Sequence, residues 1–382
     1  MDWTLFTVIL VVITALAFDY TNGFHDSANA MATSIATKAL RPRVAVLIAA
    51  ILNVAGAFLS TAVAKTISGG IVNDGLVTPL MVFCGLVGAI LWNLVTWLLG
   101  LPSSSSHALF GGLIGAVLIG GGIHAVNFSV VLSKIVLPAI VAPVVAGLAA
   151  ALATYLAYRF IRDPEHGTAV RGFRYGQTVS ASMVALAHGT SDGQKTMGVI
   201  TLVLITAGYQ ESGSGPQFWV IAAAGLAIGL GTYSGGWRIM RTMGKGLVDI
   251  FAPQGFAAET SSSAAILASS HLGFGLSTTQ VCAGSVIGTG FGKKLAEVRW
   301  TTARKMLYGW LLTLPAAATV GAVSAAVART GTVGVIVVAT ALIAAACTIW
   351  AISRRNAVSA DNVNDSPDVT IAPAAPVEPA AI

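Results

Sequence analysis

The sequence predicts an all-α integral membrane protein with about 11–12 membrane segments, arranged as two inverted-topology repeats with broken helices and re-entrant hairpins. The 382 residues are 55% hydrophobic and only 9% charged, whereas soluble domains carry about 25% charged residues. Apolar stretches of about 20 residues recur along the chain. Within them a polar decapeptide occurs twice, as NGFHDSANAM at 22–31 and as HGTSDGQKTM at 188–197. This duplication predicts two related halves with a site between them.

Apolar segments account for the predicted fold in chain order. Five precede a basic loop and five follow it, and an odd number of crossings per half places the second half upside down. We expect segments at about 4–34, 43–63, 77–99, 104–122, 130–158, 178–208, 217–236, 250–272, 277–292, 306–327 and 331–351. The predicted organisation is a first inverted repeat (1–162), a cytoplasmic basic loop (163–177), a second inverted repeat (178–327), an additional C-terminal membrane helix (328–355) and a disordered tail (356–382).

The basic residues set the orientation. If the first crossing runs from outside to inside, 17 of the 21 lysines and arginines lie on the cytoplasmic side. Lys65, Lys134 and Arg329 lie outside, and Lys195 stays within the membrane. This bias predicts a multi-pass protein of the plasma membrane. Basic residues spread between apolar segments exclude a nucleic-acid partner. Three cysteines without metal-ligand spacing predict neither a disulfide framework nor a cysteine-bound metal, and we expect no cofactor.

Four carboxylates fall within apolar sequence, namely Asp19, Asp26, Asp192 and Glu259. Intramembrane charges are costly and mark ion or substrate paths. Asp26 and Asp192 occupy equivalent positions of the two decapeptides, so they are the strongest candidates for a coupling ion or proton. A structural, hydrogen-bonded carboxylate is the alternative for each.

Glycine beside each aspartate predicts a break in the helix. Gly23 and Gly189 allow the chain to unwind and to expose carbonyl groups for a cation. The exposed N-termini of the resulting half-helices favour an anion. Asn22 and Asn29 add amide groups that donate or accept hydrogen bonds. One motif therefore serves both a cation and an anion.

A second repeated pair supplies hydroxyl groups. LGLPSSSSHALFGGLIG at 99–115 corresponds to LGFGLSTTQVCAGSVIG at 272–288, and both stretches are short and rich in glycine and serine, as re-entrant hairpins are. A tetrahedral oxyanion needs converging neutral donors, which also allow its release. Packing or back-bonding to carbonyl groups is the alternative. The candidates are Ser104, Ser105, Ser106, Ser277, Thr278 and Thr279.

Three further side chains lie beside these motifs. Lys195 takes the place of Asn29 in the second repeat, where it either pairs with Asp192 or attracts an anion. His25 and His107 are candidates for proton carriers, although packed and hydrogen-bonded histidines are the commoner case.

At these residues the sequence resembles the inorganic phosphate transporter (Pit) family, and within it the low-affinity actinobacterial type. The repeated Asn-Asp-x-Ala-Asn motif of the family corresponds to HDSAN at 25–29 and to a degraded SDGQK at 191–195. Its hydroxyl-rich hairpin corresponds to PSSSSH at 102–107 and LSTTQ at 276–280. The resemblance covers about residues 1–350. A glutamate common in the second span of the family is replaced by Asn53, and with fewer carboxylates the sequence favours protons over sodium as the coupling ion.

The resemblance implies a secondary active transporter that imports inorganic phosphate by proton or sodium symport with alternating access, in a homodimer. Asp26, Asp192, Asn22 and Glu259 then handle the coupling ion, with sodium at Asp26 and Asp192 as the one expected metal. The serines and threonines above, with Asn29 and Lys195, then bind phosphate. The substrate is free phosphate or a neutral metal–phosphate complex.

Three other functions stay open at this point. A sulfate or other oxyanion permease of the same fold needs the same donors. An intramembrane hydrolase has Ser, His and Asp at membrane depth, but a duplicated site has no reason to exist in a single-centre enzyme. A channel differs in that its flux ignores a cation gradient.

Overall fold

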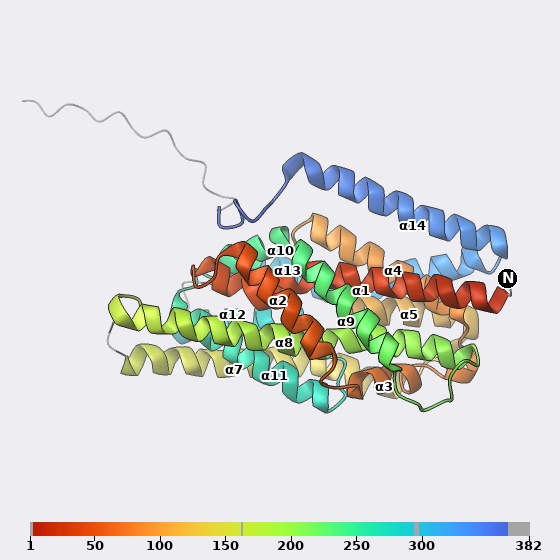
Figure 1. Ribbon diagram of the computed structural model, residues 1–382, viewed down its shortest axis with the longest axis horizontal. Helices are drawn as coiled ribbons and strands as arrows, with labels where there is room; N and C mark the ends of the chain where they lie inside the picture. Colours follow the sequence, from red (N-terminus) through yellow and green to blue (C-terminus); the bar gives the residue numbers. More distant parts are fainter. Residues whose placement is uncertain (1–2, 162, 294–297, 366–382) are drawn as a thin grey trace, which may run out of the picture.

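The computed structural model describes residues 3–161, 163–293 and 298–365, and its regular elements there are helices (Figure 1). Each expected membrane segment corresponds to a helix or to a pair of helices joined by a bend. The α-helices are α1 (Trp3–Ala36), α2 (Pro42–Ala57), α3 (Ala62–Gly69), α4 (Pro79–Leu98), α5 (Ser105–Gly121), α6 (Phe128–Val131), α7 (Leu137–Phe160), α8 (Gly167–Thr206), α9 (Phe218–Ser234), α10 (Trp237–Arg241), α11 (Ala252–His271), α12 (Thr278–Lys293), α13 (Trp300–Ala328) and α14 (Thr332–Ser353).

The described chain crosses a membrane several times. Five helical stretches are long and apolar enough to span a bilayer, and two bent pairs raise this number to seven. The bends are 65° between α2 and α3 and 62° between α9 and α10. Broken helices are therefore present, but they lie in the second segment of each half.

The two decapeptides lie inside unbroken helices, contrary to the expectation that Gly23 and Gly189 unwind them. Both α1 and α8 run straight through their polar motifs. The glycines serve a different purpose: a Cβ on Gly23 would lie 2.3 Å from the Ile228 carbonyl oxygen of α9. A Cβ on Gly189 would lie 2.2 Å from the Asn53 carbonyl oxygen of α2. Because glycine has no side chain, the backbones of two helices can come into contact at these positions. Each helix keeps its own backbone hydrogen bonds.

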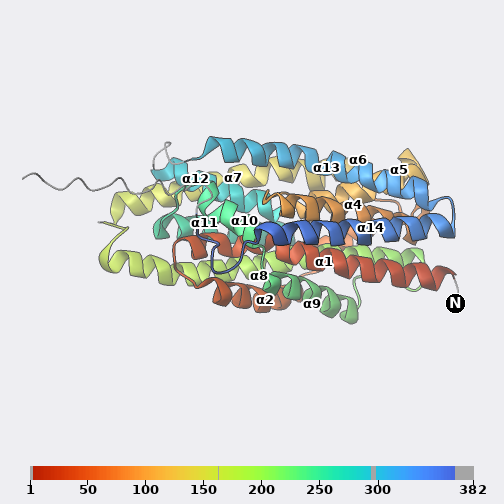
Figure 2. The same cartoon turned by 90° about the horizontal axis from the view of Figure 1, so that it is seen from above.

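The packing of the helices crosses between the two halves. The first helix of each half, α1 or α8, packs against the second helix of the other half, α9 or α2. The α4–α5 hairpin packs against α13, and the α11–α12 hairpin packs against α7 (Figures 1 and 2). The result is a central unit of α1, α2, α8 and α9 flanked by two hairpin units. Helix α14 lies along the edge of the bundle against α13 and α4.

The hairpins bring polar turns to the middle of the bundle. A proline starts α4, and Thr78 caps it by accepting a hydrogen bond from the Met81 amide at 3.4 Å. After α4 the chain turns through Gly100, whose φ of 63° favours glycine, and re-enters as α5 at Ser105. Gly273, with a φ of 71°, makes the matching turn before α12.

Two expected irregular segments are more ordered than composition predicts. The basic loop expected at 163–177 is short, because α8 already begins at Gly167. The tail expected to be disordered from 356 onwards starts as a packed segment: Val363 is buried, and Arg241 donates to the Asn362 carbonyl group at 2.7 Å. Local composition cannot reveal such contacts with distant arginines. Residues 366–382 of that tail lie outside the described residues.

Candidate functional site

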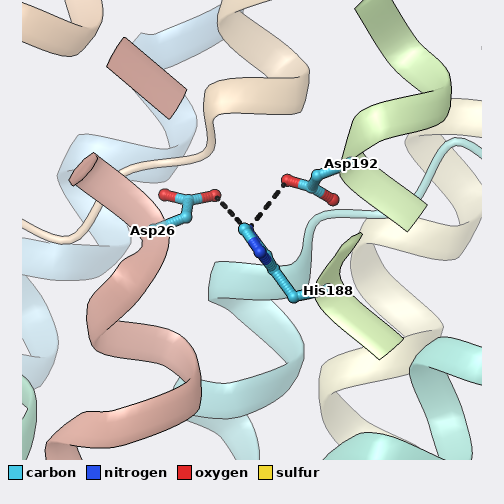
Figure 3. Close-up of side chains that lie close together, drawn as sticks. All are labelled: Asp26, His188 and Asp192. Carbon is cyan, nitrogen blue, oxygen red and sulfur yellow. Dashed lines mark ion pairs between the residues drawn. The ribbon is translucent and has the colours of Figure 1, made fainter. Parts of the chain in front are cut away.

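Asp26 and Asp192 meet at the centre of the bundle, where α1 and α8 cross. Both side chains are buried. His188, one turn before Asp192 on α8, points between them (Figure 3): its Nε2 lies 3.5 Å from an Asp192 oxygen and 3.9 Å from an Asp26 oxygen. One ligand atom from each of these three residues falls within 4.8 Å of the other two. This geometry suits a single positive charge, either a proton on His188 or a small cation between the carboxylates.

The hydroxyl-bearing hairpin tips close on the same carboxylates from both sides. Ser105, at the start of α5, donates to Asp26 Oδ1 at 3.1 Å. Thr278, at the start of α12, reaches Asp192 Oδ2 at 3.3 Å and Asp26 Oδ2 at 3.5 Å. Asn29 donates to the Thr279 hydroxyl group at 3.0 Å. Residues more than 250 positions apart along the chain thus share one polar cluster.

The first hydroxyl of each expected triplet has a structural role in this conformation. Ser104 Oγ accepts a hydrogen bond from the His107 amide at 3.1 Å, and Ser277 Oγ accepts one from the Gln280 amide at 3.3 Å. Both serines are therefore N-caps, of α5 and α12. The residues that follow them, Ser105 and Thr278, direct their hydroxyl groups at the aspartates instead.

Lys195 forms an ion pair with a carboxylate of its own helix. Its ammonium group lies 2.5 Å from Asp192 Oδ1 and also donates to the Ser106 hydroxyl group. The lysine is fully buried, so the pair is shielded from solvent. Ser106 in turn donates to the Leu276 carbonyl group at 3.2 Å, which joins the two hairpin tips. Of the two open interpretations of Lys195, pairing with Asp192 is the one that the structure contains.

The other motif side chains complete the shell around the aspartates. His25 Nδ1 lies 2.6 Å from Asp26 Oδ1, and its Nε2 lies 3.1 Å from the Thr96 hydroxyl group of α4. The Asn22 amide nitrogen donates to Asp192 Oδ2 at 3.4 Å. His107 lies apart from this shell, with its Nδ1 3.5 Å from the Gln280 side chain.

His188 is the central residue that sequence reasoning missed. Its Nδ1 lies 3.0 Å from Asn53 Oδ1, and the Asn53 amide nitrogen donates to the Thr232 hydroxyl group at 2.7 Å. An oriented Asn53 oxygen fixes the proton of His188 on Nδ1, so Nε2 faces the two carboxylates. The signal lay in the repeat itself, because the offset of 166 that aligns Asp26 with Asp192 also aligns Asn22 with His188.

Glu259 does not join this cluster in the described structure. It is buried in α11 and accepts hydrogen bonds from Thr33 at 2.6 Å, Gln177 at 3.1 Å and Ser180 at 2.5 Å. Thr33 follows Asp26 by two turns, and Ser180 precedes Asp192 by more than three. In the orientation predicted from the basic residues, Glu259 would lie on the cytoplasmic side of the aspartates.

Two relatives with similar sequences share one description. The model of the phosphate transporter family matches residues 22–171 and 162–321. A probable low-affinity inorganic phosphate transporter of Mycobacterium tuberculosis is 54% identical over 95% of this chain and 88% of its own length. A Bacillus subtilis protein of the same description is 40% identical over 85% of this chain and 98% of its own length.

A solved structure has the same fold. The protein titled "The sodium-dependent phosphate transporter" matches 85% of this chain and 99% of its own chain, with a TM-score of 0.76 and 24% sequence identity. The likeness confirms the helical membrane fold that the sequence predicts.

Proposed function

Because this chain belongs to the phosphate transporter family, we propose that it imports inorganic phosphate by cation symport, with a site built around Asp26 and Asp192. The relatives are transport proteins, so the chain is a transporter and not an intramembrane hydrolase. The observation that carries the proposed site is the convergence of two hairpin tips on the same two buried carboxylates.

The tips supply what an oxyanion needs. Helices α5 and α12 begin at these tips, and the first amides of a helix lack intrahelical partners. Such an N-terminus attracts an anion through its free amides and its dipole. The hydroxyl groups of Ser105, Ser106, Thr278 and Thr279, with the Asn29 amide group, add neutral donors from two directions. Neutral donors hold phosphate without trapping it.

Charge balance supports symport. With neutral histidines, the buried cluster holds two aspartates against one lysine, so it is already net negative. Adding a phosphate anion to this lipid-shielded site is strongly unfavourable unless a positive charge enters with it. The space between Asp26, His188 and Asp192 is where a proton or a sodium ion meets that need. Lys195 then serves phosphate indirectly, by neutralising Asp192.

The same architecture supports alternating access as part of the proposal. In this conformation both hairpin tips and both aspartates are buried, so a route must open on each side in turn. We expect the hairpin units to move against the central unit of α1, α2, α8 and α9, because the site lies where these units meet.

Uptake of labelled phosphate into proteoliposomes tests the function directly. Purified protein is reconstituted, and proton and sodium gradients are imposed separately. We expect phosphate accumulation driven by at least one gradient and its loss in Asp26→Asn, which removes the charge at the centre of the cluster. Accumulation that ignores both gradients would indicate a channel. Full competition by sulfate would indicate a general oxyanion permease.

The remaining expectations belong to the same proposal. We expect a homodimer in the plasma membrane, where the exposed apolar side chains of α7 and α14 face lipid or a second copy. Mass measurement in native detergent micelles tests the dimer. Uptake with and without divalent metal ions tests whether the substrate is free phosphate or a metal–phosphate complex.

A further inference from the structure

Asp19 is a buried carboxylate that the site described above does not use. It lies on α1, seven residues or about two turns before Asp26, and it is fully buried. In the described part of the chain, neither of its carboxylate oxygens has a hydrogen-bond partner. A buried charge without partners is strongly unfavourable, and such an unsatisfied group indicates a bound ion or water.

Two further oxygen atoms without partners lie beside it. Asn22 and Thr196 are the polar side chains that face Asp19. Within the described residues, Asn22 Oδ1 and Thr196 Oγ1 have no hydrogen-bond partner either. Asn22 follows Asp19 by three residues and so shares its helix face, while Thr196 comes from α8, which packs against α1. The amide nitrogen of Asn22 donates to Asp192 Oδ2 at 3.4 Å.

The nearest ammonium group does not neutralise Asp19. Lys195 is the nearest positive charge to Asp19 among its neighbours. Its donors, however, are directed to Asp192 and Ser106, and neither Asp19 oxygen receives a hydrogen bond from it. A cation bound beside Asp19 would supply the positive charge that no described side chain donates to it.

We propose that Asp19, Asn22 and Thr196 form a sodium site. A carboxylate, an amide oxygen and a hydroxyl oxygen are hard ligands, which favour a hard cation. A single negative charge suits a monovalent cation better than calcium, which gathers several carboxylates. The inference rests on the proposed symport and gives sodium a place separate from the Asp26–His188–Asp192 triangle.

The position of the site suggests how sodium affects the centre. Asp19 precedes Asp26 on the helix that enters from outside, so the site lies on the outward side of the aspartates. Asn22 joins the two, because its side chain lies beside Asp19 and its amide nitrogen donates to Asp192. The second half has no equivalent site, because the residue that the repeat aligns with Asp19 is Ala185. Sodium binding therefore orders one side of the site only.

Thermal unfolding of the purified full-length protein tests the site without relying on transport. The midpoint is followed against sodium chloride, with choline chloride at equal ionic strength and fixed pH as the reference. We expect sodium to raise the wild-type midpoint, because a ligand of the native state stabilises it. Asp19→Asn should abolish this rise. Thr196→Val should raise the half-saturating sodium concentration by about tenfold or more.

Thr190→Val is the matched control. Thr190 is also buried in α8, but its hydroxyl group donates to the Leu186 carbonyl group of its own helix at 2.8 Å. This variant should keep the wild-type response to sodium. An unchanged sodium response in Asp19→Asn overturns the inference. If Asp19→Asn does not fold, Thr196→Val decides, and equal sodium affinities of the two threonine variants overturn it.

The outcomes for the site and for the proposed function can be separated. Wild-type protein that takes up phosphate under a proton gradient but shows no sodium response overturns the sodium site and retains the transporter. Wild-type protein that responds to sodium through Asp19 but transports no phosphate overturns the proposed function and retains the sodium site.

Discussion

Neighbouring hydroxyl groups at the α5 tip have different tasks. Ser105 donates to Asp26, whereas Ser104 accepts from the backbone as an N-cap. The first contact is available to the transported ions, and the second stabilises a helix. We therefore expect Ser105 to affect transport and Ser104 to affect folding.

The serine pair gives a prediction with its own control. Ser105→Ala should lower phosphate uptake about tenfold or more, since a hydrogen bond to a charged group contributes about 1.5–3 kcal/mol. Ser104→Ala should retain more phosphate uptake than Ser105→Ala. It should lower the free energy of unfolding by about 1 kcal/mol, because the helix loses its N-cap. Uptake in proteoliposomes and thermal unfolding measure the two effects. Equal uptake in the two variants would contradict the assignment.

Lys195 predicts a stability effect. Lys195→Met should lower the free energy of unfolding by about 3–5 kcal/mol, because it leaves Asp192 buried and unpaired. Adding Asp192→Asn should restore most of that loss, since the double variant removes both charges. Unfolding followed by circular dichroism at a fixed pH measures the change. If the double variant is no more stable than Lys195→Met, the pair is not the reason that the lysine is present.

At the scale of elements, glycines decide how closely the helices of the central unit approach. Gly189→Ala should lower stability by about 1–3 kcal/mol or more, because the new methyl group meets the Asn53 backbone of α2. The control is Gly172→Ala in the same helix, where no atom lies within 4 Å of the added Cβ. That change should stabilise the protein by about 0.5–1 kcal/mol. Thermal midpoints of both variants, compared with wild type, check the prediction; two destabilised variants would refute the packing explanation.

Helix positions were predictable because a long apolar run in a helical membrane protein forms an α-helix. The segment expected at 277–292 is α12 at Thr278–Lys293, and the one expected at 77–99 is α4. The function of individual glycines and serines was not predictable in this way. Whether Gly23 unwinds a helix or admits a neighbour depends on what faces it, and composition does not contain that information.

The polar centre shows the same limit. The repeat offset singled out Asp26 and Asp192, which the structure places together. It did not reveal that Ser104 caps a helix while Ser105 points at a carboxylate, because that difference is one of rotation about the α5 axis. His188 and the packed Val363 are likewise defined by partners from distant segments.

For the whole molecule, α14 is the element that contributes least to the site. It lies at the edge of the bundle, and its side chains are mostly exposed. Deleting residues 331–382 should therefore retain most phosphate uptake. The same deletion removes the carbonyl groups of Ser353 and Asn362 that accept hydrogen bonds from Arg238 and Arg241 at 2.7 Å, so a modest loss of thermal stability is expected.

Uptake and thermal midpoint of the truncated protein measure the two effects separately. Abolished uptake in a truncated protein that remains folded would show that α14 takes part in transport.

The crossed packing of the halves has a consequence for biogenesis. While the ribosome is still making the second half, α1 and α2 enter the bilayer without the partners that later cover them. Until α8 and α9 are inserted, the polar side chains that they later cover are exposed to lipid or to the insertion machinery, among them Asp26, His25 and Asn53. We expect the first half on its own to be an insertion intermediate whose polar side chains need shielding from lipid. Synthesis that stalls between α7 and α8 should leave these side chains unpaired and the chain open to degradation.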